Sequence, residues 1–162
     1  PIWSTGAWLI IQLPSGRRLL YAQPRIHQES VLDEETGKKA RQPREYLSFL
    51  TSRGKGMVRE KAWPGLFMNN IVQGAANDVL RDASIAVHND TVQVQAIAFY
   101  LATLPEWERT AISLHVHDEL VLDIPRDSYS LKRMIELMVS SSPWAKGCPL
   151  AAEGWIGERY RK

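Results

Sequence analysis

The stretch from Leu114 to Pro125 carries the residues whose types and spacing could do chemistry. His117, Asp118 and Glu119 stand together between residues 112–116 and 120–124, in which apolar and polar side chains alternate. This alternation predicts the two strands of a hairpin, with one apolar face and a polar turn. Carboxylates at the tip of a buried hairpin repel one another and are costly to desolvate, so a cation is their expected partner. The pattern indicates a divalent metal at the turn, although a polar turn without metal explains the same residues.

A second polar arrangement lies upstream, in a segment with helical periodicity. Four polar residues recur at a spacing of four: Asn69, Gln73, Asn77 and Arg81. The apolar positions that alternate with them, and that we expect to face inward, are Ile71, Ala75, Val79 and either Ala83 or Ala86. Such a ladder of polar side chains can reach hydrogen-bond acceptors that all base pairs share in a minor groove. A polar helix face that meets only water is the alternative.

The hairpin resembles motif C of family A DNA polymerases, in which His-Asp-Glu stands between two apolar strands. The resemblance implies that Asp118 holds the catalytic metals, that Glu119 supports the metal site, and that His117 contacts the primer end. The same family carries a similar Asn-x-x-x-Gln-Gly element, which here matches Asn69, Gln73 and the following glycine. The resemblance therefore implies that these two side chains contact the primer-template, and we expect Asn77 and Arg81 to extend this DNA-binding face.

The two ends of the chain add to the resemblance. Residues 13–21, LPSGRRLLY, resemble the Gly-Arg-Arg hairpin that follows the fingers in this family. Residues 143–162 resemble the C-terminal tail of its phage-like members, and the order of all four elements agrees. The resemblance implies a DNA-directed DNA polymerase of DNA replication, which transfers nucleotides with two Mg²⁺ ions. Its implied partners are primer-template DNA and deoxynucleoside triphosphates.

Two parts of such an enzyme are not found in the sequence. There is no motif A aspartate upstream of Leu13, and no Lys-x-x-x-Asn-x-Gly pattern of a fingers helix. The chain begins at Pro1 rather than at Met, which suggests a piece of a longer protein. We therefore expect residues 1–162 to form one domain, the C-terminal part of a palm. We also expect it to bind primer-template weakly, and to need a missing upstream half before it extends a primer.

Composition limits the other possibilities. With 162 residues, of which 44% are hydrophobic, the chain can bury one core. The single cysteine, Cys148, excludes an internal disulfide and favours a reducing, cytoplasmic setting. The resemblance implies that this is the cytoplasm of a bacterium or a phage-infected host. The longest apolar run, residues 7–11, is far shorter than the roughly 20 residues of a membrane-spanning helix.

Positive charge gathers in one part of a chain whose formal net charge is only +2. Between residues 38 and 61 there are two acidic residues, Glu45 and Glu60, against eight basic ones: Lys38, Lys39, Arg41, Arg44, Arg53, Lys55, Arg59 and Lys61. The segment could lie along phosphates. It could equally form a solvated loop that compensates the acidic residues 33–35.

The pattern of elements predicts an α+β fold in which an antiparallel sheet packs against long helices. We expect a hairpin at residues 7–13 and 18–21, a short helix at 44–52, and a long helix from 63 to 87. A second helix is expected at 91–104, with Asp90 as its N-cap and Pro105 after its end. A third is expected at 126–140, followed by a strand at 150–156. Its inward residues are predicted to be Leu131, Met134, Ile135 and Met138.

Two other functions stay open at this point. His115-x-His117-Asp118 would place two imidazoles on one strand face, as at the start of some zinc sites, which would fit a metal-dependent phosphoesterase. Alternatively, the chain is a non-catalytic, duplex-binding half of a split polymerase. A palm cut in half would leave apolar surface uncovered, so such a fragment would associate with its partner or with itself.

Overall fold

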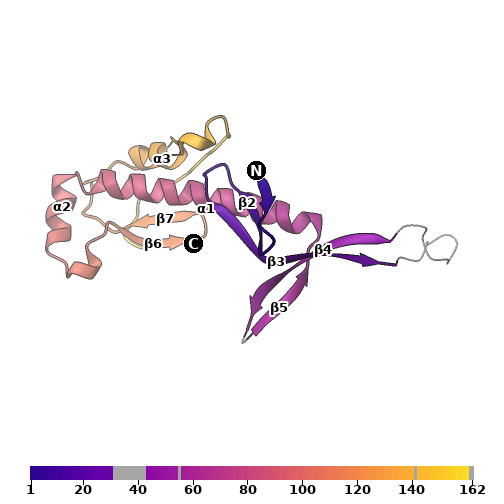
Figure 1. Ribbon diagram of the computed structural model, residues 1–162. Coiled ribbons are helices and arrows are strands. Elements are labelled where there is room, and N and C mark those ends of the chain that lie inside the picture. Colours follow the sequence, from indigo (N-terminus) through magenta and orange to yellow (C-terminus); the bar gives the residue numbers. More distant parts are fainter. Residues whose placement is uncertain (31–42, 55, 141, 161–162) are drawn as a thin grey trace. The chain divides into compact units, whose positions relative to one another are not determined.

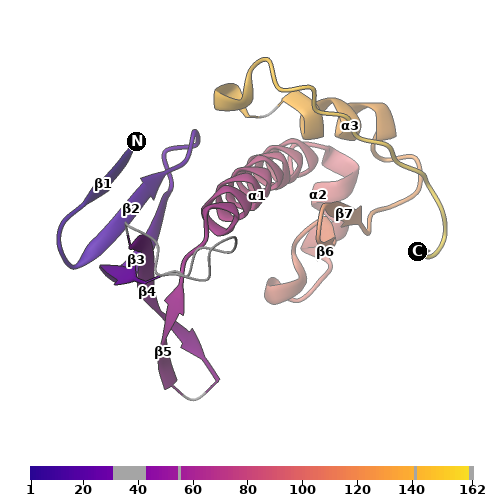
Figure 2. The same cartoon turned by 90° about the vertical axis from the view of Figure 1, so that its right-hand side faces the viewer.

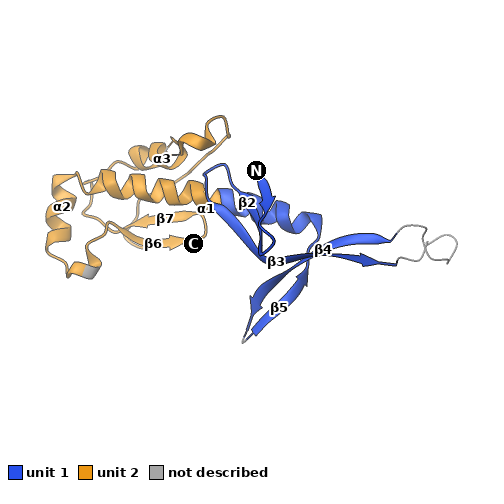
Figure 3. Cartoon of the chain, in the orientation of Figure 1, with its two compact units in different colours: residues 1–75 blue, residues 76–162 orange. Residues whose placement is uncertain are grey.

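The fold is α+β, as the sequence predicts, and it is described by a computed structural model for residues 1–30, 43–54, 56–140 and 142–160 (Figure 1). The strands are β1 (Ile2–Ser4), β2 (Trp8–Gln12), β3 (Arg18–Glu29), β4 (Arg44–Arg53), β5 (Gly56–Lys61), β6 (Ile112–Val116) and β7 (Glu119–Leu122). The helices are α1 (Pro64–Thr91), α2 (Gln95–Ala102) and α3 (Leu131–Ser140), with short 3₁₀ turns η1 (Glu106–Glu108) and η2 (Pro143–Ala145). The chain divides into two compact units, Pro1–Ala75 and Ala76–Lys162 (Figure 3).

Unit 1 is an antiparallel sheet with the strand order β1-β2-β3-β4-β5, packed on the first part of α1. Its core joins Ile11, Tyr21 and Phe49 of the sheet to partly buried side chains of α1, among them Phe67. The ring of Tyr21 meets Phe49 and Phe67 edge to face, with centroids 4.9 and 5.0 Å apart. Edge-to-face pairs add to the energy of area burial, so these three rings fix the helix on the sheet.

The first predicted hairpin is confirmed. Strands β2 and β3 are joined by a turn in which the Leu13 amide donates to the Arg17 carbonyl at 2.8 Å, and Gly16 takes a φ of 88°. Strand β3 continues well beyond the predicted residue 21, because it pairs with β2 along its first half and with β4 along its second. The register shifts between Ala22 and Arg25, where Gln23 has a φ of 46°, so the strand contains a bulge.

The short helix predicted at residues 44–52 is wrong, because this segment is strand β4. Leu47 and Phe49 pack on the core of unit 1, while Ser48 lies between them on the other face. This period of two matches a strand. Strand β4 pairs on both sides, with β3 and with β5, and these partners decide its conformation.

Helix α1 begins one residue later and ends four residues later than predicted, and it runs unbroken past the boundary between the units. Pro64 occupies its first position, where the missing amide costs no hydrogen bond. A Cβ on Gly74 would come within 2.8 Å of Leu13, and the Gly74 carbonyl accepts from Arg17 Nη2 at 2.8 Å. The glycine therefore allows the β2–β3 turn to pack closely on the helix.

Unit 2 contains the rest of α1, with α3 and the β6–β7 hairpin on different sides of it (Figures 1 and 2). A core of Ile97, Leu101 and Ala111 is packed by Leu122, Ile124 and Tyr129, among others. None of the helices in the described part of the chain is long and apolar enough to cross a membrane.

Three boundary predictions in unit 2 are wrong. Asp90 is not an N-cap, since α1 continues to Thr91 and Val94 precedes α2. Helix α3 begins at Leu131 rather than at residue 126, although its four predicted inward side chains are all half-buried. Residues 150–156 form no strand, and Trp155 and Ile156 are exposed. The apolar residues of that segment therefore do not form a strand of the core.

Candidate functional site

The hairpin predicted around His117, Asp118 and Glu119 is confirmed. Strands β6 and β7 pair antiparallel, and Val116 lies opposite Glu119, so only His117 and Asp118 form the turn. His117 has a φ of 53°, in the left-handed region that two-residue hairpin turns use because it matches the twist of the strands. The turn thus brings an imidazole and two carboxylates together at one end of the hairpin.

The single apolar face predicted for this hairpin is wrong. Ile112 pairs with Leu122, but the next pair is Leu114 with Val121, so the register shifts around Ser113. A bulge of this kind turns the following residues of its strand to the opposite face. Leu114 is 45% exposed, whereas Leu122 packs on the core of unit 2.

The turn itself is exposed, in contrast to the buried tip that the sequence predicts. His117, Asp118 and Glu119 all lie in the exposed class, so the two carboxylates keep their hydration. Their position therefore does not by itself demand a cation, because the desolvation penalty is avoided. It does leave the Asp118 carboxylate open to a ligand that arrives from solution.

Tyr160 is a residue of this site that sequence reasoning missed. Its hydroxyl donates to Glu119 Oε2 at 2.6 Å. This hydrogen bond, together with the negative charge of Glu119, raises the pKa of the Tyr160 hydroxyl, because the ionised phenol could no longer donate. No local pattern in the sequence signals the contact, since 41 residues separate the two side chains.

The metal-binding capacity of the described residues is partial. Asp118 and Glu119 supply carboxylate oxygens, the ligands that Mg²⁺ prefers, but an octahedral Mg²⁺ takes six. Among the described residues there is no group of three or more His, Cys, Asp or Glu side chains placed to hold a metal ion. If these two carboxylates held Mg²⁺, the remaining ligands would have to come from water, substrate or another polypeptide.

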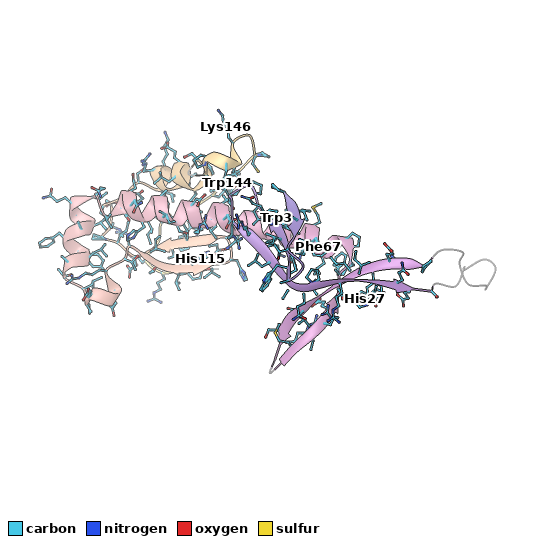
Figure 4. The ribbon with its side chains drawn as sticks, viewed as in Figure 1. Trp3, His27, Phe67, His115, Trp144 and Lys146 are labelled. Atoms are coloured by element: carbon cyan, nitrogen blue, oxygen red, sulfur yellow. The ribbon has the colours of Figure 1, made fainter. Side chains whose placement is uncertain are left out.

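The zinc-like arrangement of two histidines on one strand face is wrong. His115 lies in β6 opposite Leu120, while His117 lies outside the strand, in the turn (His115 is labelled in Figure 4). The two imidazoles therefore do not share a strand face. This removes the geometric reason for a zinc-dependent phosphoesterase.

The polar ladder on α1 lies on an exposed surface. All four of its residues are in the exposed class: Asn69, Gln73, Asn77 and Arg81. The predicted inward positions are also confirmed, since Ile71 packs on the core of unit 1 and Ala83 is buried. Asn69 and Gln73 belong to unit 1, whereas Asn77 and Arg81 belong to unit 2 with the hairpin.

Arg81 differs from the three amides of the ladder, because it is already engaged. Its guanidinium lies 3.1 Å from Asp82 and 3.6 Å from Asp78, which is 1% exposed. Asp82 also accepts from Trp144 Nε1 at 2.8 Å and from Ser142 at 3.1 Å (Trp144 in Figure 4). Burial raises the pKa of Asp82, but the hydrogen bonds from Trp144, Arg81 and Ser142 outweigh it and the net pKa is lowered.

A second anionic centre holds the end of α1 to α3. Asp90 accepts three hydrogen bonds from Arg133, one from Nη2 at 2.7 Å and two from Nε at 3.2 and 3.3 Å, and another from the Tyr129 hydroxyl. The bonds from Arg133 and then from Tyr129 lower the pKa of Asp90. Burial, followed by the bond to Asp90, raises the pKa of Tyr129. Asp90 is therefore an anchor between helices.

The basic segment is only partly described. Lys38, Lys39, Arg41 and Lys55 lie outside the described residues. Two of the others form ion pairs, Arg53 with Glu60 at 3.2 Å and Lys61 with Glu29 at 2.7 Å. Arg59 donates to the Gln23 carbonyl and to Ser48.

Comparison with known proteins gives one relationship. The chain is 36% identical, over 158 residues, to a DNA polymerase of Bacillus phage SP02; the match covers 95% of this chain and 20% of that polymerase. The chain thus spans about a fifth of the length of the curated relative that it matches. No family model matches the chain, and no solved structure matches it.

Proposed function

We propose that this chain is the C-terminal part of the palm of a family A DNA polymerase, and that it contributes half of a two-metal centre for nucleotidyl transfer. One observation carries the proposal: the two-residue turn that exposes Asp118 beside Glu119 and His117. The similarity to a part of a phage DNA polymerase supports it independently of the motif, because the match extends over nearly the whole chain.

In this proposal Asp118 is the carboxylate that holds Mg²⁺, and Glu119 is the supporting carboxylate. When bound, the ions lower the pKa of the primer 3′-hydroxyl and stabilise the charge that develops on the transferred phosphate. The protein holds Glu119 in place through Tyr160, whose hydroxyl occupies one oxygen of its carboxylate. In the same proposal His117, which is exposed at the turn, donates to the end of a primer strand.

We assign the contacts with the primer-template to helix α1. Asn69 and Gln73 carry amides that can donate to minor-groove acceptors of any base pair, which gives binding without sequence preference. Asn77 lies one turn further along the helix and extends the same contact. Arg81 is the weakest member of this assignment, because two carboxylates already hold its guanidinium.

The proposal implies an upstream polypeptide that supplies the second palm aspartate and the fingers, with deoxynucleoside triphosphates as substrates in a bacterial or phage-infected cytoplasm. Exposed apolar side chains on α1 support such an association. Met68 is 62% exposed and Val72 is 59% exposed, beside the ladder residues Asn69 and Gln73. An apolar strip of this kind is suited to burial against another chain, or against a second copy of this one.

Primer extension tests the proposal. We expect this chain alone, with Mg²⁺ or Mn²⁺, to extend no primer, because it carries one of the two palm aspartates. Adding a polypeptide that contains motif A and the fingers should produce extension, and Asp118→Ala should abolish it. Extension by the unmodified chain alone would show that another carboxylate, such as Glu119 or Asp123, completes the centre.

A further inference from the structure

One face of the sheet in unit 1 is not covered by α1, and its side chains follow from the register of the strands. Trp8 pairs with Ala22, Ala22 with Leu50, and Leu50 with Arg59, which forms a row across four strands. The next row is Arg25, Ser48 and Lys61, and the third is His27 with Tyr46. Paired residues point to the same side of a sheet, so these three rows share a face, here called the open face.

The bulge in β3 makes the open face continuous. Without it, the period of two would carry Arg25 to the side of the sheet that α1 covers, because Ala22 and Arg25 are three residues apart. The extra residue between them restores both to one face. Trp8 of β2 thereby shares this face with Arg25 of β3, while Arg59 of β5 shares it through the row that contains Ala22 and Leu50.

Charge is distributed unequally between the two faces of this sheet. The same side of the sheet extends beyond the three rows to Arg18, Glu29 and Arg44. By register, this side carries one carboxylate, Glu29, against five cations: Arg18, Arg25, Arg44, Arg59 and Lys61. On the α1 side, the same strands carry Arg53 against Glu45 and Glu60. The excess of positive charge on one face, in a chain whose net charge is only +2, is complementary to a polyanion.

Aromatic side chains lie among these cations, and several are fixed by the protein. Tyr46 stacks on His27, with an angle of 13° and centroids 4.9 Å apart, and Lys61 Nζ lies 4.1 Å from the Tyr46 ring centroid. His27 is fixed in turn by Ser48, whose hydroxyl lies 2.7 Å from its Nε2 and which is 2% exposed. His27 is labelled in Figure 4. Trp8 is 42% exposed, and in the described part of the chain its indole forms no ring or cation contact.

We propose that the open face binds a single strand of nucleic acid, with its cations on the phosphates and a base stacked on Trp8. Basic sheets that carry exposed aromatic rings suit single strands, since unstacked bases can lie on the rings. A duplex keeps its bases stacked on one another and offers this face only its phosphates. The open face shares no residue with the polar ladder of α1 or with the β6–β7 turn, so this proposal does not depend on the proposed function.

The test measures the fluorescence anisotropy of labelled strands of thymidylates, of uridylates, and of a DNA duplex, each titrated with the whole chain at low salt. We expect both single strands to bind more tightly than the duplex. Binding of both thymidylates and uridylates would show that the face recognises the phosphates and bases that DNA and RNA share, rather than one sugar. Arg25→Gln should weaken single-strand binding and reduce the salt slope by about 0.7. Trp8→Ala should weaken it at least about fivefold, the smallest effect expected for loss of one stacked base.

Arg53→Gln is the matched control, because it also removes one positive charge, but from the side of the sheet that α1 covers. Arg25 is exposed, and in the described structure its side chain forms no hydrogen bond or ion pair, so its replacement tests the face even if Trp8→Ala perturbs folding. Binding that is unchanged by Arg25→Gln, or weakened equally by Arg53→Gln, overturns the proposal. So does duplex binding that Arg25→Gln weakens as much as it weakens single-strand binding. Asn89→Ala, at an exposed position of α1 outside the proposed duplex contact, should leave single-strand binding unchanged.

Discussion

Tyr160 and Glu119 are joined by a 2.6 Å hydrogen bond between the tyrosine hydroxyl and the carboxylate beside the β6–β7 turn. The contact ties the C-terminal segment to the candidate metal-binding residues. Asp118, the neighbouring carboxylate, has no such restraint among the described side chains. Of the two carboxylates at the turn, Glu119 is therefore oriented by a hydrogen bond, whereas Asp118 remains open to a ligand.

The first prediction concerns the titration of Tyr160. Because its pKa is raised by Glu119, Tyr160 should ionise at a higher pH than an ordinary exposed tyrosine. Glu119→Gln removes the negative charge and should lower this pKa, which can be followed by tyrosinate absorbance. Tyr160→Phe should remove the same titration step. If Glu119→Gln leaves the titration curve unchanged, the hydrogen bond does not form in solution.

The second prediction concerns the acid sensitivity of the Asp90 anchor. Arg133 and Tyr129 lower the pKa of Asp90 below its unfolded value, so the carboxylate stabilises the fold above about pH 4. That stabilisation is lost as the pH falls through the folded pKa. We expect Asp90→Asn to lower the free energy of unfolding at pH 7 by about 1 kcal/mol, a figure that allows for the exposure of the pair.

Denaturant unfolding at several pH values measures this effect. The difference between the wild type and Asp90→Asn should begin to shrink below about pH 4, where the unfolded chain takes up the proton, and should be lost once the pH falls below the lowered pKa of the native carboxylate. Asp123→Asn, at an exposed aspartate, should cause little change at any pH. A difference that stayed constant down to pH 2 would show that Asp90 acts by packing rather than by charge.

The third prediction is that the chain unfolds as one cooperative domain. Helix α1 contributes Ile71 to the core of unit 1 and the buried Ala83 and Val87 to unit 2, without a break between them. Melting either unit would leave half of a 28-residue helix without its packing. Thermal unfolding followed by near-UV and far-UV circular dichroism should give coincident midpoints. Two separated transitions would instead define two domains.

The fourth prediction concerns the polar ladder. Asn69→Ala and Gln73→Ala should each weaken binding to a primer-template duplex about fivefold, the effect of losing a hydrogen bond worth about 1 kcal/mol. The factor should be similar for A·T-rich and G·C-rich duplexes, since the acceptors are shared. Asn89→Ala on the same helix is the matched control, because Asn89 lies 20 residues further along the helix and is therefore far from Asn69. Equal losses in all three variants would contradict the assignment.

The sequence predicted those elements whose signals are local. The β2–β3 and β6–β7 hairpins have their turn residues and alternation within a few positions, and α1 repeats its apolar pattern over many turns. Strand β4 was missed because its conformation depends on pairing with β3 and β5. The residues 150–156 were misread because apolar composition does not reveal whether a partner strand is present.

The position of the β6–β7 turn was predictable, whereas the environment of its side chains was not. The turn at His117 and Asp118 follows from the flanking apolar strands, whereas the bulge near Ser113 leaves no local signal and alters which side chains are buried. Asp90 was read as a helix cap because asparagine and aspartate favour that position. Its actual partners, Tyr129 and Arg133, lie 39 and 43 residues away. Contacts of this kind depend on the tertiary fold.

The most direct test of the central claim is primer extension by a chimaera. In it, this chain replaces the matched segment of the Bacillus phage SP02 DNA polymerase, to which it is 36% identical over 158 residues. We predict that the chimaera extends a primer with Mg²⁺, and that Asp118→Ala in this segment abolishes extension while duplex binding persists. A folded chimaera that extends equally well with Asp118→Ala would contradict the claim that Asp118 belongs to the catalytic centre.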